Sequence, residues 1–285
     1  MNIKESVSNT KRNSCEMASN RDFWFPSDEV VVDESRILGK GAFGEVRVAT
    51  WRNLEIAAKR LHNLDEANDV ASMEKEMMIL SKLRHPNLVL FLGVTGVHET
   101  GRITMILTEL MPFSLYDILE EQKVKLILPE ILDIAYDVAL GLDYLHHHDP
   151  PIVHRDISCK NILLSDKRAK IADLGQAKLF GSNASSRQTS LPGAMAYSAP
   201  EVLMGKYNIE IDVFSFGILL AQLCSHEYPR IERRDEQLSL AATNFRPLES
   251  IIEACTKYHP KDRPLTPVIC KELDRLKKND RFYPI

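Results

Sequence analysis

The feature that most constrains this chain is the segment of residues 154–161, which an apolar run, residues 162–164, follows directly. A carboxylate, a lysine and an amide, from Asp156, Lys160 and Asn161, fall within six residues of one another. A tight loop could point all three side chains into one cleft. The composition of this segment therefore indicates a catalytic loop, provided that partner motifs stand at suitable distances on both sides.

Length and composition limit the kind of protein. A chain of 285 residues is near the size at which a single core divides, so we expect one bilobal unit or two small domains. The 36 Lys and Arg against 40 Asp and Glu give a net charge of −4, which argues against nucleic acid as a partner. Five scattered cysteines without a C-x-x-C pair indicate neither a disulfide framework nor a zinc site, and favour a cytoplasmic location.

The longest apolar stretch also bears on location. It covers residues 213–224, is interrupted by Ser215 and Gln222, and is too short to span a bilayer. We therefore expect no membrane insertion.

The two ends of the chain are expected to be tails. Residues 1–22 are polar with little to bury and predict a flexible tail, and residues 281–285 predict a short C-terminal one. Three adjacent aromatic residues, Phe23 to Phe25, would be poorly placed in water, so we expect them to pack on the domain that follows.

A glycine-rich segment opens that domain. Its G-x-G-x-x-G pattern, residues 39–44, also occurs in dinucleotide-binding folds, where it opens a helix. Here residues 45–49 alternate polar and apolar and predict a strand, so the glycines turn a hairpin whose amides can approach phosphates. A dinucleotide-dependent oxidoreductase is excluded on this ground and because repeated strand and helix crossovers are missing.

A lysine inside an apolar strand predicts an acidic partner. Lys59 lies within residues 55–61, and burying its charge is costly unless it is paired. A helix is expected over residues 65–83, and its inward stripe comprises Val70, Met73, Met77 and Leu80. Glu76 falls at the edge of that stripe, whereas Glu74 points roughly the other way, so Glu76 is the expected partner.

Two more strands, residues 88–97 and 103–108, are expected to complete a small sheet, and the rest of the chain favours helices. A long helix leading to the catalytic loop is predicted by the spacing of Ile131, Ile134, Ala135, Val138, Ala139, Leu142 and Leu145. Three consecutive histidines, residues 146–148, indicate the end of that helix rather than a metal site, because adjacent helical side chains point in different directions.

The motifs together resemble a protein kinase domain of the tyrosine-kinase-like group. Residues 154–161 match H-R-D-x-x-x-x-N, Lys59 matches the lysine of V-A-I-K, and Asp173 matches the Asp of D-F-G. The A-P-E and D-V-x-S-F-G motifs follow at residues 199–201 and 212–217. The resemblance implies an α+β, bilobal fold, with a small antiparallel β-sheet lobe carrying one helix and a larger, mainly helical lobe.

The same resemblance implies domain boundaries and two structural roles. The kinase domain would cover residues 23–280, divided into an N-lobe, a hinge and a C-lobe at residues 23–108, 109–111 and 112–280. Asp212 would hold the backbone of the catalytic loop, and Arg263 would pair with Glu201 of the A-P-E motif.

The function implied is transfer of the γ-phosphoryl group of Mg-ATP to Ser or Thr hydroxyls of protein substrates. Asp156 would be the base, Lys160 a further catalytic-loop residue, and Lys59, held by Glu76, would steady the phosphates. Asn161 and Asp173 would hold Mg²⁺. The implied ATP-binding residues are Leu38, Gly39, Lys40, Gly41, Ala42, Phe43, Gly44, Val46, Ala57, Lys59, Thr108, Glu109, Met111 and Leu163.

The acceptor type and the activity itself have alternatives. Ser158 and Ala194 stand where Ser/Thr kinases usually carry Lys and Thr, but residues 173–196 contain no Tyr to autophosphorylate. We favour Ser/Thr transfer, with dual specificity open and a tyrosine-specific kinase as an alternative. Leu174 stands where the D-F-G motif has Phe, and the hinge lacks its usual Gly. These departures keep a pseudokinase scaffold as the second alternative.

A polar segment, residues 176–198, resembles an activation loop. It carries the hydroxyl residues Ser182, Ser185, Ser186, Thr189 and Ser190. An upstream activating kinase could phosphorylate one of them, and Arg155 and Lys178 could then bind the phosphate. The sequence does not indicate an oligomeric state.

Overall fold

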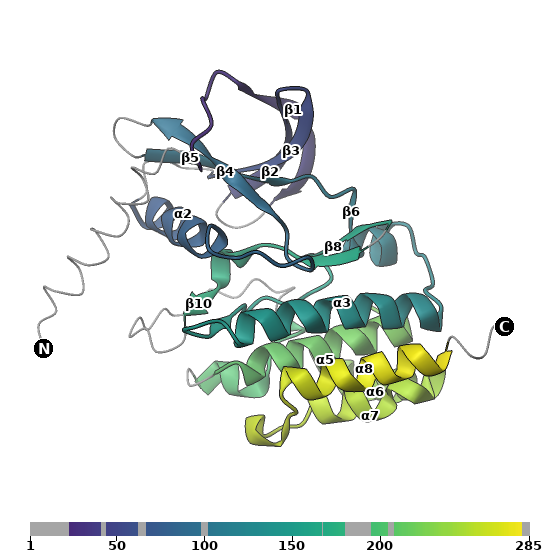
Figure 1. Ribbon diagram of the computed structural model, residues 1–285. Helices are drawn as coiled ribbons and strands as arrows, with labels where there is room; N and C mark the ends of the chain where they lie inside the picture. The colour runs from purple at the N-terminus through teal and green to yellow at the C-terminus, as the bar shows by residue number, and fades with distance from the viewer. Residues whose placement is uncertain are drawn as a thin grey trace, which may run out of the picture. The chain divides into compact units, whose positions relative to one another are not determined.

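The computed structural model describes residues 23–40, 44–61, 67–97, 102–166, 168–179, 195–204 and 208–280. These residues form two compact units (Figure 1). The N-terminal unit runs to Arg84 and also contains Val89–Met111, and the C-terminal unit contains His85–Leu88 and the chain from Pro112 onward.

The N-terminal unit is built on an antiparallel sheet whose described strands follow the order β1-β2-β3-β5-β4 (Figure 1). The strands are β1 (Val30–Lys40), β2 (Gly44–Trp51), β3 (Leu54–Leu61), β4 (Phe91–Val97) and β5 (Arg102–Glu109). One face packs into a core around Ala49, Ile56 and Leu107, as the apolar alternation of the strands requires. The expected strand after the glycines is confirmed, since β2 pairs with β1 as a hairpin.

Helix α2 (Ala67–Leu80) belongs to the same unit and buries Met73, Met77 and Leu80. It ends three residues before the predicted end at residue 83. Leu83 is nevertheless buried, in the turn that follows.

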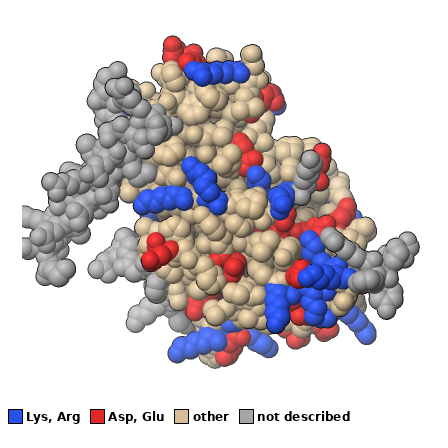
Figure 2. All heavy atoms as spheres, in the orientation of Figure 1, with Lys and Arg blue, Asp and Glu red and all other residues tan. Residues whose placement is uncertain are grey.

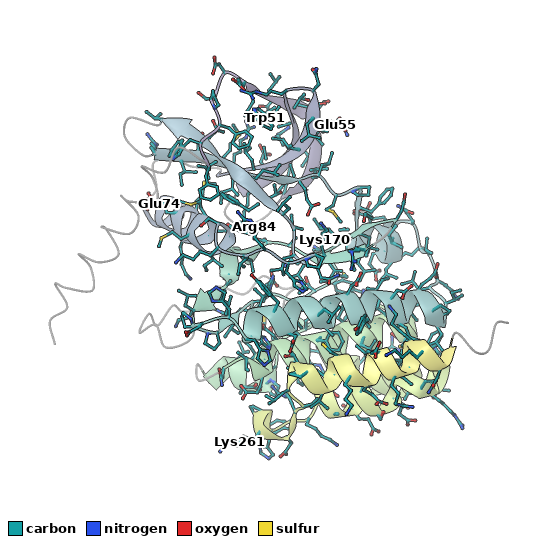
Figure 3. The ribbon with its side chains drawn as sticks, in the orientation of Figure 1. Trp51, Glu55, Glu74, Arg84, Lys170 and Lys261 are labelled. Carbon is teal, nitrogen blue, oxygen red and sulfur yellow. The ribbon has the colours of Figure 1, made fainter. Side chains whose placement is uncertain are left out.

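The aromatic residues of the N-terminal segment pack on this sheet, as expected. The Phe23 ring lies 5.6 Å from the Phe91 ring, and the Phe25 ring lies 4.4 Å from Trp51, which Figure 3 labels. A Cβ at Gly93 would come within 2.4 Å of the Phe23 carbonyl oxygen. The segment therefore lies directly against β4, where only glycine leaves room for it.

The C-terminal unit is mainly helical. Its helices are α3 (Leu128–His146), α5 (Glu210–Ser225), α6 (Arg234–Asn244), α7 (Arg246–Cys255) and α8 (Thr266–Asp280). Helix α5 is buried from Ile211 to Ser225, and Figure 1 shows it among the other helices. An almost uniformly apolar helix needs such a position, because it has no polar face to turn to water. No helix among the described residues could cross a membrane.

Short strands and turns complete this unit. The strands are β6 (Phe113–Ser114), β7 (Ile152–Val153), β8 (Ile162–Ser165), β9 (Arg168–Ile171) and β10 (Lys178–Leu179). Strand β8 pairs with β6 and β9, and β7 pairs with β10. Short one-turn helices cover Asp117–Glu121 (η3), Leu174–Gln176 (η4), Pro200–Met204 (η5), Ile231–Arg233 (η6) and Pro260–Asp262 (η7).

Charged side chains of both signs are interspersed on the face that Figure 2 shows. This agrees with the small net charge of −4.

Candidate active site

The lysine of β3 is ion-paired within the N-terminal unit. Lys59 Nζ lies 2.8 Å from each carboxylate oxygen of Glu76 on α2. Glu76 is 5 % exposed, whereas Glu74, labelled in Figure 3, is only half-buried on the same helix. The structure therefore pairs Lys59 with Glu76 rather than with Glu74.

The glycine-rich hairpin lies in the same sheet. Leu38, Gly39 and Lys40 end β1, and Gly39 and Lys40 face Val46 and Glu45 of β2. Val46 also faces Lys59 of β3, so the hairpin and the lysine are adjacent in register. Gly44 begins β2, while Gly41, Ala42 and Phe43 lie outside the described residues.

The other predicted nucleotide-binding residues of this unit lie on the central strands and just after them. Ala57 of β3 faces Thr108 of β5, and Ala57 is buried. The backbone N–H of Leu90 donates to the Glu109 carboxylate at 2.7 Å. Met111 is buried at the end of the unit.

Four charged residues link β1, β2 and β3 beside the hairpin. The Glu45 carboxylate accepts from Arg47 Nε and Nη2 at 2.8 and 3.0 Å, and from Arg60 Nε at 2.9 Å. Arg60 also donates to both carboxylate oxygens of Glu34, at 2.8 and 2.9 Å. The two arginines lower the pKa of Glu45 to about 2, with the Arg47 hydrogen bonds the largest cause. This cluster, Glu34, Glu45, Arg47 and Arg60, is called the hairpin network below.

In the C-terminal unit, one buried carboxylate fixes the backbone of the catalytic loop. Asp212 of α5 accepts from the backbone N–H of His154 and of Arg155, each at 2.8 Å. Its Oδ2 is also 3.0 Å from His146 Nε2. These bonds hold Arg155 in a left-handed conformation, φ 73°, which is unfavourable for a side chain other than glycine.

Asp156 is positioned by its own loop. Asn161 Nδ2 donates to the Asp156 carbonyl oxygen and to Oδ2, both at 2.8 Å. Burial raises the pKa of Asp156; the charge of Asp173 adds to the rise, while His154, Asn161 and Lys160 oppose it. The carboxylate therefore holds a proton more readily than an exposed aspartate does.

Asn161 and Asp173 each offer an oxygen. The bonds to Asp156 use the amide nitrogen of Asn161, which leaves its carbonyl oxygen as the atom that could bind a metal. Asp173 is exposed, has φ 55°, and accepts from Gly175 N at 3.2 Å through Oδ1. Leu163, on β8, is half-buried and faces Ser114 and Lys170.

The Glu of the A-P-E motif binds a buried arginine. Arg263 Nη1 and Nη2 donate to the two carboxylate oxygens of Glu201 at 2.5 and 2.9 Å. The Arg263 side chain is fully buried and also donates to the carbonyl oxygens of Lys257, Tyr258 and Glu210. Both this pair and the Asp212 contacts were expected from the sequence and are observed.

Comparison with known proteins identifies the family that has this arrangement. A family model described as protein tyrosine and serine/threonine kinase matches residues 32–273. The chain belongs to the protein kinase family. The N-terminal and C-terminal units are the N-lobe and C-lobe of a kinase domain, and the predicted fold class is confirmed.

Individual relatives differ in the acceptor that their names give. The chain is 37% identical over 255 residues to the seven transmembrane domain-containing tyrosine-protein kinase 1 of Dictyostelium discoideum, covering 80% of this chain and 36% of that protein. The dual specificity protein kinase shkC of the same organism is 34% identical over 263 residues, covering 86% and 51%. The serine/threonine-protein kinase CTR1 of Arabidopsis thaliana is 35% identical over 244 residues, covering 80% and 29%. The chain thus spans at most about half the length of these relatives.

Several predicted features of the chain fall outside the described residues. These are the five activation-loop hydroxyl residues and Ala194, in addition to Gly41, Ala42 and Phe43, and the two predicted tails, residues 1–22 and 281–285. Lys160 is described, and its Nζ lies 4.9 Å from the centroid of the Tyr116 ring.

Some interactions around the site were not predicted. They are the hairpin network, the contact of His146 with Asp212, and the buried contacts of Cys159, Tyr197 and Gln222. The sequence did indicate that Gln222 has a hydrogen-bond partner. This residue interrupts the apolar run of residues 213–224, and a polar side chain in a buried helix must be hydrogen-bonded.

Proposed function

We propose that this kinase domain transfers the γ-phosphoryl group of Mg-ATP to Ser or Thr hydroxyls of protein substrates. The observation that carries the proposal is that the groups this chemistry needs are present and held in place. Lys59 is paired with Glu76 in the N-lobe, and Asp156 is bonded to Asn161 in the C-lobe. A pseudokinase scaffold that no longer transfers phosphate would need neither the Lys59–Glu76 pair nor the Asp156–Asn161 hydrogen bonds.

Lys59 would bind the α and β phosphates. Its ammonium group has three hydrogens, and the Glu76 carboxylate fixes its direction by accepting at 2.8 Å through either oxygen. Because the pair is largely buried, little rearrangement is needed when ATP binds.

Asp156 would orient the acceptor hydroxyl and take its proton. The raised pKa of Asp156 suits a base better than that of an exposed aspartate, since a stronger base accepts the proton more completely. His154 supports the loop: its Nδ1 accepts from the Asp156 backbone N–H at 3.2 Å and its Nε2 donates to the Ala172 carbonyl oxygen at 2.9 Å.

The residues at the predicted metal site fit Mg²⁺. Asn161 and Asp173 offer an amide oxygen and a carboxylate oxygen, and Mg²⁺ prefers a few protein oxygens completed by phosphate and water. When bound, the ion would offset the negative charge of the phosphates.

The acceptor type can be tested with three peptides that differ only in Ser, Thr or Tyr at one position. We expect transfer to the Ser and Thr peptides with kcat/KM at least about tenfold above that for Tyr. Comparable rates on all three would show dual specificity, and transfer to Tyr alone would contradict the proposed acceptor.

We propose a cytoplasmic location for the kinase domain. The four cysteines in the described part of the chain are free thiols, which suits a reducing compartment.

The hairpin network should affect ATP affinity. Replacing Glu45 by Gln removes the carboxylate that joins Arg47 of β2 to Arg60 of β3, beside the glycine-rich hairpin and Lys59. We expect the KM for ATP to rise about two- to fivefold, the size of a solvent-screened charge interaction, with kcat nearly unchanged. Steady-state kinetics at varied ATP concentration measures both constants.

The matched control for this variant is Glu55→Gln. Glu55, labelled in Figure 3, pairs with Arg36 in the same sheet, but both side chains are about half exposed. We expect the control to keep the wild-type KM. Equal KM values for Glu45→Gln and wild type would show that the network does not position the hairpin.

A further inference from the structure

A line of buried polar side chains crosses the C-lobe from the catalytic loop. The Tyr197 hydroxyl is 3.2 Å from Cys159 Sγ and 2.6 Å from Gln222 Oε1 of α5. Gln222 Nε2 then donates to Glu120 of η3 at 3.1 Å. Cys159, Tyr197 and Gln222 are at most 1 % exposed. We call Cys159, Tyr197, Gln222 and Glu120 the polar relay.

The hydrogens of the polar relay assign a donor to each bond. The Glu120 carboxylate only accepts, so the amide of Gln222 must present its nitrogen to Glu120 and its oxygen to Tyr197. The tyrosine hydroxyl has one hydrogen, and the 2.6 Å contact assigns it to Gln222. The bond to Cys159 is then donated by the thiol hydrogen.

Two members of the polar relay, Cys159 and Tyr197, adjoin motifs that the reaction requires. Cys159 directly precedes Lys160 and Asn161, and its carbonyl oxygen accepts from Tyr116 N at 2.9 Å. Tyr197 lies two residues before the A-P-E motif, and its carbonyl oxygen accepts from Ser215 Oγ at 3.0 Å.

The backbone around Tyr197 is held from α6 as well. Arg234 Nη2 donates to the carbonyl oxygen of Ala196 at 2.9 Å. Met195, at the start of this described stretch, is 37 % exposed, so a protein substrate near the catalytic loop could reach it. Residues 195–199 therefore combine a fixed backbone with an exposed side chain.

We propose that Cys159, Tyr197 and Gln222 are positioning residues that hold residues 195–199 in register with the catalytic loop, and so set the affinity for the protein substrate. The inference rests on the proposed function and deepens it. The hydrogen bonds of the polar relay lie within the C-lobe, whereas Lys59 and the glycine-rich segment belong to the N-lobe, so its effect should fall on the protein substrate and not on ATP.

The side chain at residue 159 permits a sharp test. Cys159→Ala removes the group that donates to the Tyr197 hydroxyl oxygen and leaves that hydroxyl only its bond to Gln222, whereas Cys159→Ser keeps a donor in a side chain of nearly the same size. Cys224 supplies the control, because it is equally buried in the same lobe, on α5, and lies outside the relay.

Two readouts separate this inference from the proposed function. In steady-state kinetics with a serine peptide, we expect Cys159→Ala to raise the peptide KM about two- to tenfold, the effect of one lost buried hydrogen bond, with the KM for ATP unchanged. Cys159→Ser should restore the wild-type value, and Cys224→Ala should not change it. Amide hydrogen exchange, which needs no activity, should become faster in Cys159→Ala at Asn161 and Ser198, whose N–H groups bond to Ser158 and Met195.

Faster exchange at both amides in Cys159→Ala, but not in Cys224→Ala, supports the polar relay even if the wild-type chain transfers no phosphate. Unchanged exchange and an unchanged peptide KM in Cys159→Ala would overturn it. An equal rise in the KM values for peptide and ATP would also overturn it, because that pattern indicates a general loss of structure.

Discussion

Replacing Asp156 by Asn is expected to lower kcat by about two to four orders of magnitude, the contribution of a general base. An amide cannot take the proton of the acceptor, although its oxygen can still accept from Asn161 Nδ2. Because burial raises the pKa of Asp156, its charged form is held at a cost. The variant should therefore be at least as resistant to thermal unfolding as the wild type, which is the behaviour of a functional residue rather than a structural one.

Steady-state kinetics and a thermal melt on the same preparation check both parts. A variant that keeps activity within about tenfold of wild type would remove Asp156 from the role of base. A variant that loses activity together with its fold would show instead that the Asp156 carboxylate is needed for the structure of the loop.

The pH dependence follows from the same carboxylate. The base must be ionised, so kcat/KM should fall as the pH drops through the raised pKa of Asp156, above the range in which an exposed aspartate titrates. Lys160 lowers that pKa by its charge. Replacing Lys160 by Met should therefore move the acidic limb to higher pH, whatever it does to the maximal rate.

Replacing Glu201 by Ala is expected to destabilise the C-lobe by about 3–5 kcal/mol, because the fully buried Arg263 loses its counter-charge. For a unit of this size the melting temperature should fall by roughly 6–20 °C. Chemical and thermal unfolding followed by circular dichroism measure the loss.

A surface ion pair in the same lobe provides the control for Glu201. Glu272 accepts from Arg275 at 2.5 Å, but the two side chains are 35 % and 56 % exposed. Glu272→Ala should leave the melting temperature unchanged, since solvent screens an exposed pair. Equal effects of the two substitutions would show that burial does not make the Glu201 pair stronger.

Much of the site could be predicted because the spacing of its residues and their chemistry together limit which partners are possible. Lys59 lies inside an apolar strand, so its partner had to be a carboxylate on a neighbouring element, and the helical period favoured Glu76 over Glu74. Helix α3 was predicted for the same reason, since seven apolar residues repeat at one period.

Element ends were predicted less well, because apolar spacing reports burial rather than hydrogen bonding. Leu83 continues the stripe of α2 although the helix ends at Leu80. Similarly, the predicted strand from residue 88 begins only at Phe91, since Leu88 pairs with Ile171 in the C-lobe.

Contacts between residues far apart in the sequence could not be predicted without the fold. Glu45 and Arg60 meet only because β2 and β3 pair in one register. Gln222 and Glu120 are 102 residues apart and meet through the packing of α5. The polarity of Gln222 was a signal that it needs a partner, but nothing in the sequence identified which one.

Transfer of labelled γ-phosphate from Mg-ATP to a mixed peptide library, with Asp156→Asn beside the wild type, tests directly whether this domain is an active kinase. The library samples many acceptor sequences, and treatment with an activating kinase beforehand allows for an activation loop that must be phosphorylated. We expect transfer by the wild type, its loss in Asp156→Asn, and phosphoserine or phosphothreonine in the hydrolysed product. No transfer by the wild type after that treatment would contradict this expectation and favour a kinase fold that acts as a scaffold.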